Sequence, residues 1–214
     1  MSPKPRLLLV DDHHMVLQGL RLELEPEFEI VGMLATGTQV AEQCRKLQPD
    51  LVLLDLSLPD RGGLEVIADI WSAGSNTRIL IVTMHRDRIL ADACLHAGAA
   101  GFIPKDADVG ELKSAIRQVL AGKSYLSPLV PDRPPKFSSM DIAFPLAQLT
   151  PRQQTILRLL GDGKSTACIA AELHLSANTV TFHRARIRKA LGIPSEFALL
   201  KYALMVKMEE DRSR

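Results

Sequence analysis

Short apolar runs alternate with longer amphipathic segments over the first 125 residues of the chain. Five of the runs are too short for helices and are predicted to be strands: 7–10, 30–34, 51–54, 79–82 and 101–103. Runs that are apolar on both faces are typical of a parallel sheet covered on both sides. The segment from Val109 to Leu120 instead has one apolar face and precedes Gly122, as a helix would. We predict a doubly wound α/β unit of five parallel strands and five helices.

From residue 147 onward the apolar positions recur at helical spacing, which predicts helices over 151–160, 165–173, 177–191 and 196–208. Thr150, Pro151 and Gln153 have the form of a capping box with proline at the first helical position. Only residues 174–176 separate the second and third helices, and the third is rich in Arg and Lys. Two short helices joined in this way are typical of a helix-turn-helix. The second unit is therefore predicted to be an all-α, four-helix domain.

Proline marks the join between the two patterns, because six of the 13 prolines lie between residues 128 and 151. We predict domains over 1–125 and 147–214, with a stiffened linker over 126–146. Charge divides at the same place. The net charge of +1 combines −4 in residues 1–125 with +5 in residues 147–214. The two units are thus expected to have different partners, with nucleic acid a candidate for the basic one.

The overall composition, 46% hydrophobic and 24% charged, favours a globular protein. No apolar run is long enough to span a bilayer, and residues 1–10 lack the apolar region of a signal peptide. A cytoplasmic protein without a membrane partner is expected. Cys44, Cys94 and Cys168 are odd in number and far apart, so we expect reduced, packed thiols rather than a disulfide or zinc site.

Polar side chains follow four of the five predicted strands, where ligands bind in such sheets. They are Asp11, Asp12, Asp55, Thr83 and Lys105. Three carboxylates at one edge repel each other, which protonation, splaying into solvent or a bound cation would relieve. Oxygen ligands suit Mg²⁺, and a carboxylate beside Mg²⁺, an ammonium and a hydroxyl can become an acyl phosphate. Asp55 is predicted to be the nucleophile, Lys105 to neutralise the phosphoryl oxygens, and Thr83 to donate a hydrogen bond to them.

Four stretches of the first unit resemble, in order, the receiver domain of two-component response regulators. They are LLLVDDHHMVLQGL (7–20), DLVLLDLSLPDRGGLEVI (50–67), ILIVTMH (79–85) and GAAGFIPKDA (98–107). The resemblance implies a flavodoxin-like fold in which Asp55 accepts phosphate from a sensor histidine kinase. It also implies that Asp11, Asp12 and Asp55 hold Mg²⁺ with the main-chain carbonyl of Ser57.

The same resemblance assigns Lys105 to the phosphoryl group and makes Thr83 and Phe102 a switch pair. Met84 departs from the family, which often has a small residue after the switch hydroxyl, so access of phosphodonors and water is expected to be slower. No role is assigned to three nearby histidines, which are expected to be exposed in loops: His13, His14 and His85.

The stretch LTPRQQTILRLLGDGKSTACIAAELHLSANTVTFHRARIRKALGI (149–193) resembles the LuxR/NarL-type DNA-binding domain. The resemblance implies that helix 177–191 enters the major groove of promoter DNA and that the last helix forms a dimer contact. The base-facing stripe, spaced i, i+3, i+4 and i+7, comprises Asn178, Thr181, Phe182 and Ala185. At least two of the four basic residues of this helix are expected to contact phosphates: Arg184, Arg186, Arg188 and Lys189.

The whole chain thus resembles response regulators of the NarL/FixJ family, which carry a LuxR-type helix-turn-helix. Phosphorylation is expected to produce a homodimer and to free the helix-turn-helix for promoter DNA. Such a protein is not a classical enzyme, although its receiver assists its own phosphorylation and dephosphorylation. Two alternatives stay open: a phosphate-independent DNA-binding protein, and a flavodoxin-fold hydrolase. The hydrolase is disfavoured because Ser57 stands two residues after Asp55, where a second acid would be needed.

Overall fold

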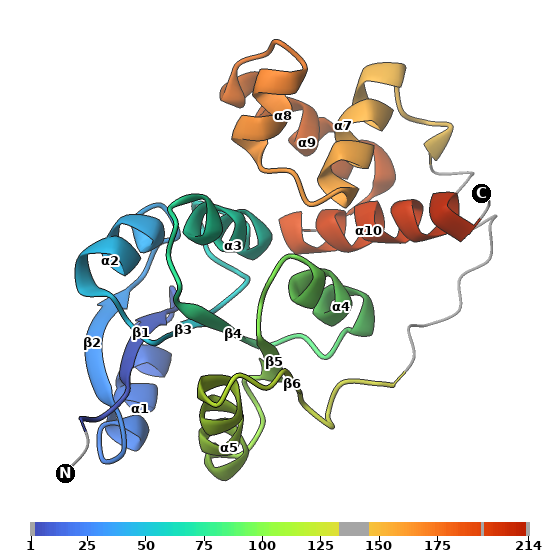
Figure 1. Cartoon of the computed structure of the whole chain (residues 1–214). Coiled ribbons are helices and arrows are strands. Elements are labelled where there is room, and N and C mark those ends of the chain that lie inside the picture. The colour runs from blue at the N-terminus through green and yellow to red at the C-terminus, as the bar shows by residue number, and fades with distance from the viewer. Residues whose placement is uncertain (1–2, 133–145, 194, 213–214) are drawn as a thin grey trace. The chain divides into compact units, whose positions relative to one another are not determined.

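The computed structural model describes residues 3–132, 146–193 and 195–212, and the chain divides into two compact units, Met1–Asp132 and Arg133–Arg214 (Figure 1). Each unit is described by itself. No helix in the described part of the chain is both long and apolar enough to cross a membrane.

The first unit is a parallel sheet with the strand order β2-β1-β3-β4-β5-β6. Its strands are β1 (Arg6–Val10), β2 (Glu29–Leu34), β3 (Leu51–Leu54), β4 (Arg78–Thr83), β5 (Gly101–Pro104) and β6 (Tyr125–Leu126). Its helices are α1 (His14–Leu24), α2 (Val40–Leu47), α3 (Gly63–Ser72), α4 (Arg88–His96) and α5 (Val109–Leu120). Helices α1 and α5 cover one face of the sheet, and α2, α3 and α4 cover the other (Figure 1). The α/β class is confirmed.

All residues of β3 and β5 are buried, as expected for strands covered on both faces. On the α1 and α5 side, the core joins strand residues such as Leu9 and Leu53 to Leu17 and Ile116 of the helices. This two-sided burial fixes the strand register, so that the carboxyl ends of β1, β3, β4 and β5 lie at one edge.

The sheet has a sixth strand, whereas the sequence predicts five. β6 is only two residues long, too short for an apolar run, and it forms because the edge of β5 offers unpaired backbone groups. Tyr125 pairs with Gly101, and Leu126 with Phe102. Ser127 and Val130 are also buried, so residues 126–132, placed in the linker by the sequence, pack within the first unit. Most of the predicted linker, 133–145, lies outside the described residues.

The second unit has four long helices in its described part: α7 (Pro151–Gly161), α8 (Thr166–Glu172), α9 (Ala177–Leu191) and α10 (Glu196–Arg212). The predicted capping box is confirmed, because Thr150 Oγ1 accepts from Gln153 N and Thr150 N donates to Gln153 Oε1. His174 adopts a left-handed conformation with φ 52°, which closes the tight turn between α8 and α9.

Helix α10 extends four residues beyond the predicted end at Met208. No glycine or proline follows Met208 to stop it, and ion pairs between Lys207 and Asp211 and between Arg212 and Glu209 support the last turn.

One of the three cysteines differs from expectation. Cys44 and Cys94 are buried free thiols, but Cys168 is exposed on α8. Burial raises the pKa of Cys44 to about 11, so that thiol is unreactive at neutral pH.

We expect Gly161→Ala to destabilise the second unit, because a Cβ atom there would lie 2.5 Å from the main-chain oxygen of Ala203 on α10. Helix–helix overpacking of this kind lowers the free energy of unfolding by about 1 to 3 kcal/mol. Denaturant unfolding followed by far-ultraviolet circular dichroism would measure it. Trp71, the single tryptophan, lies in the first unit, so its fluorescence should report an unchanged unfolding transition for that unit.

The matched control is Gly19→Ala on α1, where an added Cβ meets nothing within 4 Å. This variant should be as stable as wild type or more stable, by up to about 1 kcal/mol, since alanine favours a helix over glycine. Equal unfolding free energies for Gly161→Ala and wild type would show that the contact between α7 and α10 is not tight.

Candidate functional site

The polar residues predicted to gather at the sheet edge do so. Asp11 and Asp12 follow β1, Asp55 follows β3, Thr83 ends β4 and Lys105 follows β5. Parallel pairing aligns Val10 with Leu54, so the carboxylates that come next lie side by side. Asp11 and Asp55 are each only 2% exposed, which separates them from ordinary surface carboxylates.

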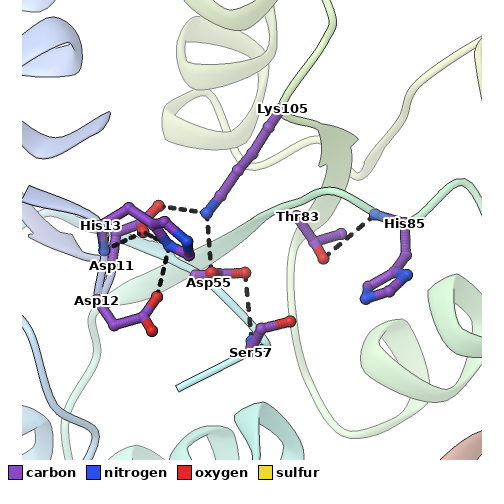
Figure 2. Close-up of polar contacts among 8 residues, drawn as sticks. All are labelled: Asp11, Asp12, His13, Asp55, Ser57, Thr83, His85 and Lys105. Atoms are coloured by element: carbon purple, nitrogen blue, oxygen red, sulfur yellow. Dashed lines mark hydrogen bonds and ion pairs between the residues drawn. The ribbon is translucent and has the colours of Figure 1, made fainter. Parts of the chain in front are cut away.

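The ammonium of Lys105 lies between two of these carboxylates. Its Nζ is 2.6 Å from Asp11 Oδ2 and 2.8 Å from Asp55 Oδ2, as Figure 2 shows. Burial lowers the pKa of Lys105, but hydrogen bonds and the charges of Asp11 and Asp55 outweigh burial and raise it above its ordinary value. Lys105 therefore carries a positive charge at physiological pH. A backbone bond from Lys105 N to Thr83 O, 2.7 Å long, fixes where its side chain begins.

The carboxylates have the arrangement of a site for a hard divalent cation. One ligand atom each from Asp11, Asp12, His13 and Asp55 lie within 4.8 Å of one another. Three carboxylates against one ammonium leave a formal charge of −2. Asp12 Oδ1 is itself buried and is contacted by the ring nitrogen Nδ1 of His13. An acidic, oxygen-rich cluster of this kind matches the preference of Mg²⁺.

His13 is the residue at this edge that the sequence reasoning missed. Its side chain is largely exposed, as expected, but its Nδ1 lies 2.7 Å from Asp12 Oδ1 and 3.2 Å from Asp11 Oδ1. The one signal in the sequence is that it directly follows the two aspartates, at the N-cap of α1. From this position the His13 ring lies beside the carboxylates of Asp11 and Asp12, as Figure 2 shows.

Three other predicted residues are placed less directly. Ser57 contacts the site through its main-chain N–H, which donates to Asp55 Oδ1 at 3.2 Å. Thr83 is fully buried, and its Oγ1 accepts from His85 N at 3.4 Å. Phe102 is fully buried in β5. Met84 is 69% exposed, so its bulk lies largely in solvent. The roles assigned to these residues stay predictions.

The stripe predicted to face DNA bases lies on the solvent side of α9. Asn178, Thr181, Phe182 and Ala185 are all exposed. Phe182 is 54% exposed and therefore does not belong to the hydrophobic core. The guanidinium of Arg186 lies 5.2 Å from its ring centroid, in a cation–π contact.

The four basic residues of α9 divide into two pairs. Arg186 and Lys189 are exposed. Arg184 and Arg188 instead form ion pairs with Glu196, the first residue of α10. α9 contains no acid of its own, but the fold brings one from the next helix.

Two family models match the chain. Residues 7–117 match the response regulator receiver domain, and residues 147–203 match the bacterial regulatory proteins of the luxR family. The chain is 34% identical over 204 residues to the transcriptional regulatory protein MctR of Rhizobium johnstonii, covering 94% of each. It is 32% identical over 207 residues to the response regulator UvrY of Escherichia coli, covering 92% of this chain and 93% of that protein.

A solved structure is also similar. It is a two-component response regulator of the LuxR family from Aurantimonas sp. SI85-9A1, 37% identical, with a TM-score of 0.57. The match covers 59% of this chain and 92% of the solved chain.

The crowding of carboxylates predicts that Asp12→Asn stabilises the protein in the absence of divalent cations. Asp12 forms no ion pair with Lys105 among the described contacts and lies against two other carboxylates, so loss of its charge relieves repulsion. The asparagine side chain keeps an oxygen that can accept from His13 Nδ1, the contact that Asp12 makes at 2.7 Å. We expect the free energy of unfolding to rise by about 1 kcal/mol, measured by denaturant unfolding with a chelator present.

The same substitution on the surface supplies the contrast. Asp92→Asn removes an i,i+4 ion pair with Arg88 on α4 and should lower stability by about 0.3 to 0.5 kcal/mol. If Asp12→Asn proved as destabilising as Asp92→Asn, repulsion at the sheet edge would not be a significant term.

Proposed function

This chain belongs to the LuxR family of response regulators, transcription factors that join a receiver domain to a LuxR-type DNA-binding domain, and we propose that phosphorylation of Asp55 controls its binding to promoter DNA. The observation that carries the proposal is the Asp55 carboxylate, which is buried, bonded to Lys105 and surrounded by the oxygen ligands of a cation site. The donor of the phosphoryl group is a sensor histidine kinase.

In the proposed reaction, a carboxylate oxygen of Asp55 attacks the phosphorus of a phosphohistidine, the P–N bond breaks, and an acyl phosphate forms. The N–H of Ser57 and the ammonium of Lys105 hold the two Asp55 oxygens, so the carboxylate is oriented before the donor arrives. Lys105 neutralises charge on the transferred oxygens. Bound Mg²⁺, held by Asp11, Asp12 and Asp55 with the Ser57 carbonyl, would supply further charge neutralisation. The same groups assist loss of the phosphate.

The added charge, about −1.5 to −2, shifts the receiver between two states. We infer that the Thr83 hydroxyl turns to the phosphoryl group and that Phe102 responds. Phe102 is well placed to pass this on, because its main-chain oxygen accepts from Ser127 N at 3.0 Å and its strand pairs with β6. The chain continues from there toward the DNA-binding unit.

The phosphorylated form is proposed to be a homodimer with its helix-turn-helix available to DNA. A change from 1:99 to 99:1 between inactive and active forms needs roughly 5.5 kcal/mol, so phosphate, dimerisation and DNA contribute together. On α9, the exposed stripe Asn178, Thr181, Phe182 and Ala185 faces the bases, with Phe182 against a thymine methyl group. The exposed Arg186 and Lys189 contact phosphates.

We expect the wild-type protein to gain one phosphoryl group when incubated with Mg²⁺ and acetyl phosphate, and Asp55→Ala to gain none. Intact-protein mass spectrometry would measure the gain. Asp60→Asn is the matched control, since Asp60 is an exposed carboxylate in the same loop that accepts bonds from Gly37 and Thr38. It should gain the group as wild type does. Two results would contradict the proposal. One is a phosphoryl gain by Asp55→Ala. The other is a wild-type chain that gains no phosphoryl group in the presence of Mg²⁺ and also fails to dimerise when beryllofluoride is added.

We expect Lys189→Ala to weaken binding to all DNA duplexes alike and to reduce the salt dependence of log K by about 0.9, the effect of one phosphate contact. Fluorescence anisotropy at several salt concentrations would measure both. Arg158→Ala is the control, because Arg158 is basic but lies on α7 in an ion pair with Glu210. An equal change in both variants would mean that α9 is not the DNA-facing helix.

A further inference from the structure

The carboxylate of Glu196, at the start of α10, forms ion pairs with two arginines of the recognition helix α9. Glu196 Oε2 lies 2.8 Å from an Arg184 guanidinium nitrogen, and Glu196 Oε1 lies 3.1 Å from Arg188. Both arginines lie one helical turn apart on α9, so one acid neutralises part of the charge of each. This acid stands in the first turn of α10, where the helix dipole favours a negative charge.

The two arginines differ in how far their side chains are exposed. The Arg184 side chain is only 12% exposed and also donates to Thr166 Oγ1 of α8, at 2.5 Å, so it links three helices. The Arg188 side chain is 32% exposed and Glu196 is 46% exposed. Water and a competing anion can therefore reach the pair formed by Arg188 and Glu196. The Arg184 guanidinium is thus occupied by contacts to α8 and α10, and its assignment as a phosphate contact stays a prediction.

A carboxylate and a DNA phosphate offer a guanidinium the same kind of charge-assisted hydrogen bonds. A guanidinium that is paired with Glu196 is therefore not available to a phosphate of the DNA backbone. Phosphate contacts raise affinity for every sequence, whereas base contacts discriminate among sequences. A carboxylate that occupies an arginine of the recognition helix therefore lowers general affinity without removing any base contact.

We propose that Glu196 is a positioning residue for DNA binding that holds Arg188 against α10 and keeps it from a backbone phosphate. The inference rests on the proposed DNA contact of α9. With Glu196 in place, backbone contact depends on the exposed Arg186 and Lys189, and the stripe that includes Phe182 supplies a larger share of the binding free energy.

The test is Glu196→Gln in the full-length chain, with a mixed-sequence DNA duplex as the probe and fluorescence anisotropy across a salt series. Release of Arg188 to one phosphate steepens the slope of log K against log salt by about 0.9. At about 0.1 M salt, this corresponds to roughly five- to tenfold tighter binding. A merely structural role for Glu196 would instead loosen α9 and weaken binding, with no steeper slope.

Two further variants make the result specific. Glu210→Gln removes the same charge from the same helix, where Glu210 pairs with Arg158 at 2.6 Å, and should leave the slope unchanged. Arg188→Gln should change the slope little by itself, but in the Glu196→Gln background it should return the slope to the wild-type value. Thermal unfolding of each variant confirms that it is folded.

An unchanged or shallower slope in Glu196→Gln would overturn this inference, and so would a steeper slope that persists after Arg188→Gln is added. Neither result would contradict the proposed DNA-binding function. A wild-type chain that binds no duplex even at low salt would overturn both the inference and the proposed DNA-binding function.

Discussion

Repulsion among carboxylates crowded at one edge of the sheet is the constraint around which the first unit is organised. Asp11, Asp12 and Asp55 lie close together because the parallel strands that precede them are buried on both faces and cannot shift register. The protein offsets part of this repulsion with the Lys105 ammonium, whose raised pKa keeps it charged. What is left is a net negative cluster. A net negative cluster of this kind lowers the stability of the fold, which is the usual cost of a functional site.

The connection from this edge to the rest of the chain runs through short elements. β5 lies between β4, which ends at Thr83, and β6, whose two residues bring the end of the receiver back to the sheet. Ser127 Oγ and Tyr125 Oη both donate to Glu111 Oε1, at 2.6 and 3.0 Å, which holds this segment against α5. Burial, together with the Glu111 contact, raises the pKa of Tyr125 to about 12, so its hydroxyl remains a donor throughout the physiological range. The segment that leaves the receiver is therefore fixed to the strand that contains Phe102.

In the second unit, the residues that repel each other are basic rather than acidic. A helix with four basic residues and no acid is favourable near DNA but accumulates positive charge in its absence. Glu196 forms ion pairs with two of the four, Arg184 and Arg188, whereas Arg186 and Lys189 are exposed to solvent. In both units, a single residue of opposite sign bridges two like charges: Lys105 between two aspartates, and Glu196 between two arginines.

The sequence by itself determined the elements and much of the site. Apolar runs located five strands, caps such as Thr150 and Gly192 bounded the helices of the second unit, and strand ends identified Asp11, Asp55 and Lys105. Helical periodicity also selected the exposed stripe of α9. These features are local, because each depends on residues within a few positions of one another. The tertiary structure alone decided the contacts between distant residues: Lys105 with Asp11, β6 with β5, and Glu196 with Arg184. Such contacts depend on strand register and helix packing, which place side chains together without leaving a pattern in the sequence.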